Sequence, residues 1–87
     1  MLEEMIGQRV VIDLRSEYVV LGTLQRVEEH FLELRNADVH DLRDTDTTRE
    51  IYVAESRATG IKRNRRRLVL FCREVVAVAR LDDVVDE

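Results

Sequence analysis

The chain has 87 residues, a length that makes one domain with a thin hydrophobic core. Its net charge of −4 gives no support to nucleic-acid binding by overall charge, and no stretch approaches the roughly 18 apolar residues of a membrane span. A lone cysteine, Cys72, excludes an internal disulfide, which leaves oligomerisation as the expected source of further burial. The N-terminal residues lack the pattern of a secretory signal, so we expect a cytoplasmic protein that is not associated with a membrane.

The first half of the chain predicts one helix and three strands. Apolar residues at helical spacing ahead of a glycine predict a short helix over residues 2–6. Alternation of apolar and polar residues then predicts strands over residues 8–14, 18–27 and 30–37. Gly22 lies inside the long second strand, where a glycine marks a sharp bend or a close approach of two backbones.

A charged insert, about residues 39–66, follows the third strand. Thr47 and Glu50 fit a capping box, and Gly60 fits a helix stop, so the insert predicts a helix over residues 48–59. Its apolar face is weak, and we therefore expect it to pack at an edge of the domain or against another subunit. The residues assigned to that face are Ile51, Ala54, Glu55 and Ala58.

Two more strands follow the insert, over residues 67–72 and 75–81, with only Arg73 and Glu74 between them. The first of the two is a continuous apolar run, which predicts a strand buried on both faces. The sequence therefore predicts a mainly β single domain over residues 1–87. It combines a short N-terminal helix with a five-stranded, strongly bent antiparallel sheet and a helical insert between strands 3 and 4.

Candidate catalytic and metal-binding residues are few. His30 and His40, with one distant cysteine, do not have the spacing of a metal site; we expect a polar residue at a strand start and a loop residue. Cys72 lies in an apolar run and is expected to be a small core residue. The acid pairs Glu28–Glu29 and Asp82–Asp83 fit solvated turns and tails. We predict no enzyme activity, no metal and no cofactor.

The strongest functional signal is the basic segment, residues 62–67, which reads Lys62-Arg63-Asn64-Arg65-Arg66-Arg67. Arginine binds phosphate bidentately, so the segment predicts contact with nucleic acid or another anion through Lys62, Arg63, Arg65, Arg66 and Arg67. The alternative is a structural network of ion pairs, within the chain or between subunits. The acids available for it are Asp38, Asp41, Asp44 and Asp46.

The order of elements resembles the Sm-like (LSm) fold, to which Hfq also belongs. VVIDLRSEYVVLGTLQRVEEHFLEL is similar to the first Sm motif, in which an apolar residue precedes a glycine and a carboxylate follows six residues later; here these are Leu21, Gly22 and Glu28. LFCREVVAVARLDD is similar to the second motif, with Cys72-Arg73-Glu74 in place of Ile-Arg-Gly.

The resemblance covers residues 2–38 and 67–83, and the insert between them is longer than the family's usual variable loop. It implies a small open barrel and a homo-oligomeric ring, usually of six or seven subunits. In such rings the fifth strand of one subunit pairs with the fourth strand of its neighbour. This pairing removes the open sheet edges that otherwise promote aggregation.

For RNA binding, the resemblance places His30 at or beside a base-stacking position and Arg73 at the arginine of the second motif. Leu32 stands where the family carries the asparagine that reads a base, and Glu74 stands where it carries a glycine. We therefore expect a non-enzymatic ring that binds single-stranded RNA mainly through phosphate contacts of the basic segment, with His30 and Arg73 as secondary contributors. The alternative is a scaffold ring that binds a protein partner through its insert, without nucleic acid.

Overall fold

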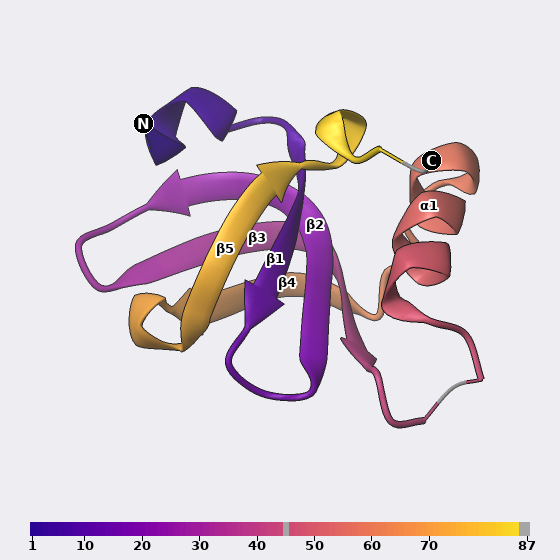
Figure 1. Cartoon of the computed structure of the whole chain (residues 1–87). Coiled ribbons are helices and arrows are strands. Elements are labelled where there is room, and N and C mark those ends of the chain that lie inside the picture. Colours follow the sequence, from indigo (N-terminus) through magenta and orange to yellow (C-terminus); the bar gives the residue numbers. More distant parts are fainter. Residues whose placement is uncertain (45, 86–87) are drawn as a thin grey trace.

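The computed structural model describes residues 1–44 and 46–85. These residues form strands β1 (Arg9–Leu14), β2 (Tyr18–Val27), β3 (Phe31–Asp41), β4 (Arg65–Phe71) and β5 (Val75–Arg80), and the helix α1 (Arg49–Thr59). Short 3-10 helices are η1 (Leu2–Met5), η2 (Cys72–Glu74) and η3 (Leu81–Asp83). All strand pairs are antiparallel, in the order β4-β3-β2-β1-β5 (Figure 1). The predicted mainly β fold, with its bent five-stranded sheet and its helix between β3 and β4, is confirmed.

The bend of the sheet lies where β2 passes β3 at Gly22. The pairing register shifts there, so that Asn36 and Ala37 of β3 form a bulge opposite Gly22. A Cβ atom added at Gly22 would lie 3.1 Å from the Cβ of Ala37, closer than ordinary contact. Asn36 has a φ of 50°, which an asparagine tolerates better than most residues. The predicted close approach at Gly22 is confirmed.

A second register shift lies further along the same strand pair. It falls between Leu24 and Arg26, and leaves Gln25 as a bulged residue of β2. Bulges increase the local twist of a strand and re-aim the side chains next to them. β3 itself continues to Asp41, beyond the predicted end at residue 37.

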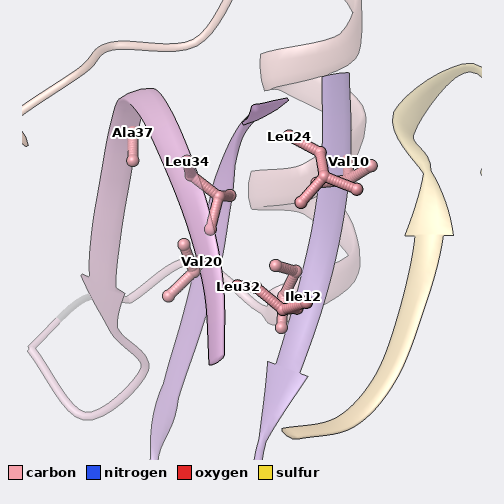
Figure 2. Close-up of a cluster of buried hydrophobic side chains, with 7 residues drawn as sticks. All are labelled: Val10, Ile12, Val20, Leu24, Leu32, Leu34 and Ala37. Atoms are coloured by element: carbon pink, nitrogen blue, oxygen red, sulfur yellow. The ribbon is translucent and has the colours of Figure 1, made fainter. Parts of the chain in front are cut away.

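The bent sheet encloses the main core. Val10 and Ile12 of β1 point inward with Val20 of β2, because alternate residues of a strand share a face. Figure 2 shows these side chains converging with others from β2 and β3. The buried members of this cluster are Val10, Ile12, Val20, Leu24, Leu32, Leu34 and Ala37. Half-buried side chains of β4 and β5, such as Leu68 and Val78, close its sides.

The opposite face of β1 and β2 is covered by α1 and η3, which lie side by side in Figure 1. Val53 of α1 and Leu81 of η3 pack there against a second buried cluster. Its strand residues are Val11, Val19 and Leu21. The helix therefore packs on a face of its own sheet and not at an edge, while its expected contact with another subunit stays a prediction.

The start and the buried face of α1 also differ from the prediction. Thr48, not Thr47, is the N-cap, and its side-chain oxygen accepts a hydrogen bond from the backbone N–H of Ile51. The buried helix residues are Val53 and Ser56, whereas Ile51 of the predicted face is 51% exposed. The two faces of α1 differ little in apolar residues, so the buried face depends on how the helix packs against the sheet. Within the described residues, no helix is both long and apolar enough to cross a bilayer.

Polar contacts also join α1 to the sheet. Arg49 forms an ion pair with Asp13 of β1, at 2.6 Å between Nη2 and Oδ1. The hydroxyl of Tyr52 donates a hydrogen bond to Asp38 of β3, and its ring stacks on His40 with centroids 3.9 Å apart. Burial, together with the hydrogen bond to Asp38, raises the pKa of Tyr52. The sequence indicated that His40 lies in a loop. This is wrong, because His40 belongs to β3.

β4 is an edge strand with one exposed face. Leu68 and Leu70 are half-buried against the core, while Val69 is 47% and Phe71 55% exposed. The prediction that this strand is buried on both faces is therefore wrong for the single chain. A continuous apolar run does not distinguish a strand at the centre of a sheet from one at its edge.

Candidate nucleic-acid interface

The basic segment lies against β3, where Asn64 attaches it. The backbone N–H of Asn64 donates to the carbonyl of Ala37 at 2.9 Å. Its side chain imitates a backbone pair, because Oδ1 accepts from the N–H of Val39 at 3.0 Å and Nδ2 donates to the carbonyl of Val39 at 3.2 Å. β4 begins at the next residue, so Arg65 and Arg66, which were expected in the insert, belong to the strand together with Arg67.

The cations of the basic segment are all exposed, and two of them have neutral partners. Arg63 donates to Oδ1 of Asn36 at 3.1 Å, and Arg65 donates to the carbonyl of Asn64 at 3.0 Å. Among the described residues, Arg67 is the one member that pairs with an acid, since its Nε lies 3.4 Å from Oε2 of Glu33.

Two of the four aspartates proposed to neutralise the segment have other partners. Asp38 accepts a hydrogen bond from the hydroxyl of Tyr52, and Asp41 forms an ion pair with Arg43 at 3.0 Å. The hydrogen bonds from Arg43 hold the pKa of Asp41 below its usual value. In the part of the chain that the structure describes, no aspartate of the insert forms an ion pair with the basic segment.

Glu33 holds two arginines from neighbouring strands. Its side chain is only 11% exposed, and it lies 3.3 Å from Arg26 of β2 and 3.4 Å from Arg67 of β4. A carboxylate shared by two guanidinium groups compensates part of the charge of each. Arg67 is therefore less available to an external phosphate than Arg63 or Arg66.

An open depression lies on each side of Asn36. One, of about 420 Å³, is lined by Asn36, Arg63, Asn64, Arg65 and Arg66. The other, of about 520 Å³, is lined by Gln25, Arg35, Asn36, Arg66 and Arg67. We call them together the bulge recess, because the bulged residues Gln25 and Asn36 both line it. Sequence reasoning missed the recess, since nothing in the alternation of residues marks Gln25 or Asn36 as bulged.

His30 and Arg73 lie near the opposite end of β4. The loop before β3 and the turn η2 are joined by a hydrogen bond from the N–H of Cys72 to the carbonyl of His30, at 2.9 Å. Both side chains are exposed, and the guanidinium of Arg73 lies 5.3 Å from the ring centre of Phe71. The structure thus brings these two predicted residues to one end of the sheet, and the basic segment to the other.

Two residues at the family motif positions leave this end without a base-reading asparagine. Leu32 is buried in the main core, and its side chain has no polar atom to offer an RNA base. Glu74 is exposed beside Arg73, with 3.9 Å between its Oε2 and the arginine Nε. This end of the sheet therefore combines one cation with a neighbouring carboxylate.

The candidate metal and nucleophile residues do not converge. Cys72 is a free, half-buried thiol that packs against the main core, as predicted. His30 lies in the loop before β3, while His40 stacks on Tyr52 on the other side of the sheet. Over residues 1–44 and 46–85, no group of three or more His, Cys, Asp or Glu side chains is placed to hold a metal ion.

Three solved structures share this arrangement of strands. The Pyrococcus abyssii Sm protein in complex with a uridine heptamer has a TM-score of 0.62 and 14% identity, over 90% of this chain and 89% of that chain. The Sm-like protein AF-Sm2 of Archaeoglobus fulgidus has a TM-score of 0.62 and 20% identity, over 92% and 88%. A heptameric archaeal Sm protein has a TM-score of 0.57 and 19% identity, over 91% and 93%.

No family model and no curated protein sequence matches the chain. The structural likeness nevertheless covers nearly the whole of it, at TM-scores of 0.57 to 0.62 and identities of 14% to 20%. The chain therefore has the Sm-like fold, in a divergent form.

Proposed function

We propose that the chain forms a ring of its own copies that binds single-stranded RNA through phosphate contacts of the basic segment. The observation that carries the proposal is the group of exposed cations Lys62, Arg63, Arg65 and Arg66, which have no acidic partner among the described residues. Such contacts give a binding affinity that depends strongly on salt and weakly on sequence. One protein of the same fold was solved with a uridine heptamer, which supports this choice of ligand.

The two open edges of the sheet support the proposed ring. β4 and β5 end the strand order, and both expose apolar side chains: Val69 and Phe71 on β4, and Val76, 66% exposed, on β5. Open apolar edges promote aggregation unless they pair with another strand. Pairing of β4 with β5 of the next copy closes a ring of six or seven subunits, and one neighbour in fold is heptameric.

His30 and Arg73 act as secondary RNA contacts in this proposal. They sit at one end of the sheet, on segments held together by the bond between Cys72 and His30. The proposal includes no catalytic step, metal or cofactor. The free thiol of Cys72 fits the reducing cytoplasm as the place of action.

Fluorescence anisotropy with labelled single-stranded RNA heptamers tests the proposal. The wild-type ring is expected to bind at low salt, with a logarithmic salt slope of about −0.7 for each phosphate contact. The double variant Arg63→Glu, Arg66→Glu is expected to bind at least tenfold more weakly and with a shallower slope. The single variant Arg66→Glu is compared with Arg57→Glu as the matched control, because Arg57 is an exposed arginine of α1 that donates to the carbonyl of Val84. Absence of wild-type binding at low salt, or equal binding by the double variant, contradicts the proposal.

A second candidate function is favoured by a groove beside α1. It has a volume of about 440 Å³ and lies between α1 and the C-terminal segment, with Ile51, Val53, Val84 and Val85 among its lining residues. Its exposed apolar side chains suit a protein partner bound by a scaffold ring. A stable ring that purifies free of nucleic acid and does not bind the heptamers fits this second function and not the first.

A further inference from the structure

The bulge recess contains two amide side chains whose polar atoms are largely unused. Asn36 accepts one hydrogen bond from Arg63 on its Oδ1 atom. Within residues 1–44 and 46–85, its Nδ2 group and the amide of Gln25 form no hydrogen bond to protein. Each amide combines a donor group and an acceptor, the two functions with which base edges are read.

The bulges explain why both amides reach the same place. In a regular β2–β3 pair, side chains alternate strictly between the two faces of the sheet. Gln25 has no partner in β3, and Asn36 has none in β2, so both depart from this alternation. Asn36 also has a φ of 50°, which turns its backbone out of the regular strand conformation. The two amides consequently line one recess although they come from different strands.

Arginines surround these amides. Arg35 and Arg66 line the recess, and neither pairs with an acid among the described residues. Arg63 lines it from the other side and is oriented by Asn36. A guanidinium group can bind a phosphate and can also stack on a base.

We propose that the bulge recess is a nucleotide-reading subsite for single-stranded RNA. Asn36 and Gln25 hydrogen-bond the edge of one base, while Arg63 and Arg66 bind the flanking phosphates. The subsite rests on the RNA binding proposed above and adds base discrimination to it. It lies at the end of β4 away from His30 and Arg73, where the buried Leu32 offers no polar atom to a base.

The test compares three heptamers, of uridine, adenosine and cytidine, with an abasic heptamer. The wild-type ring is expected to distinguish the best base from the worst by roughly five- to hundredfold, the usual range for paired amide contacts. For the double variant Gln25→Ala, Asn36→Gly, the affinities for the three base-containing heptamers are expected to lie within about twofold of one another. Its affinity for the abasic heptamer is expected to equal that of the wild type. Glycine suits the positive φ of position 36, so the bulge is retained.

Gln8→Ala is the matched control, because Gln8 carries an exposed amide whose one side-chain hydrogen bond among the described residues goes to the carbonyl of Glu4. It is expected to keep the wild-type preference, and circular dichroism checks that every variant is folded. Salt-dependent binding without any base preference, or a preference that survives the double amide variant, overturns the subsite and leaves the proposed function standing. No binding of any heptamer by the wild type overturns both.

Discussion

Gly22 is a residue of β2 that lies close against β3. A methyl group there would lie 3.1 Å from both the Cβ of Ala37 and the Cδ2 of Leu34, and 3.2 Å from the Cα of Ala37. Gly22→Ala is therefore expected to lower the free energy of unfolding by about 1–3 kcal/mol, the usual cost of overpacking a core. Urea denaturation followed by circular dichroism measures this loss.

The companion substitution is Ala37→Gly, which removes one of the methyl groups that the new alanine would meet. The double variant is expected to lose less stability than the sum of the two single losses, because the substitutions act at one contact. Simple additivity would show that Gly22 is needed for backbone conformation and not for close approach.

Tyr52 couples α1 to β3 in a way that depends on pH. Its pKa is raised by burial and by the hydrogen bond to Asp38, so the folded state holds the phenolic proton more tightly than the unfolded state does. This contribution to stability is complete below the unfolded pKa, about 10, and is lost as pH rises above it.

Tyr52→Phe is expected to be less stable than the wild type by about 1–2 kcal/mol at pH 7, because Asp38 loses its hydroxyl donor. The difference in the free energy of unfolding between wild type and variant should narrow above pH 10, where the unfolded wild-type chain releases a proton that the variant lacks. Urea denaturation at pH 7, 9 and 10.5 measures it. A difference that stays constant over this range contradicts the assignment.

At the scale of strands, Glu33 joins β2, β3 and β4 through its contacts to Arg26 and Arg67. Glu33→Gln is expected to change stability by less than about 1 kcal/mol, because both arginines are mostly exposed and remain solvated. It also releases Arg67 for RNA. We expect tighter binding at low salt and a salt slope steeper by about 0.7, the value of one phosphate contact.

The same titration by fluorescence anisotropy, run on Glu17→Gln, separates this effect from a change in overall charge. Glu17 is an exposed acid in the turn between β1 and β2, and its substitution makes the same change of one unit. Equal gains in RNA affinity for the two variants would mean that Glu33 does not compete with RNA for Arg67.

The elements themselves could largely be predicted from the sequence, because their signals are local. The bounds of β2 coincide with the predicted 18–27, and α1 differs from its predicted range only at the first residue. The exposed face of β4 and the buried face of α1 could not be predicted, because both depend on which neighbour covers them. Phe71 and Ile51 are exposed for this reason.

The candidate site could be predicted only in part. A run of arginines is visible in one stretch of sequence, whereas its partners come from strands far along the chain. Glu33 reaches Arg67 because the β3–β4 register brings them near each other, and Asn36, a bulged residue of β3, reaches Arg63. Periodicity gives neither the register nor the positions of bulges.

For the whole molecule, the exposed edge of β5 tests the ring. Val76→Lys introduces a charge at a position whose valine is 66% exposed in the single chain, so each subunit is expected to remain folded. The ring is expected to dissociate, because a charge buried between β5 and the next subunit's β4 lacks a partner. The mass measured by light scattering should fall from six or seven times the chain mass of 10.2 kDa to the mass of one chain.

Ile51→Lys is the matched control, since Ile51 is similarly exposed but lies on α1, away from both sheet edges. It is expected to leave the mass of the ring unchanged. A wild-type protein that is monomeric at micromolar concentration rules out the ring and, with it, the pairing of β4 with β5.

Asn64 fixes the start of β4 to Val39 through its own side chain, and α1 is attached independently through Val53 and Arg49. A peptide inserted after the exposed Asp44 therefore lengthens the connection without moving the strand that follows. The longer loop is expected to lower stability little, since each doubling of loop length adds only about 0.6 kcal/mol to the free energy of loop closure. Every copy in an assembly can thus carry a fluorescent tag at the same point, and stepwise photobleaching of single particles then counts the subunits directly.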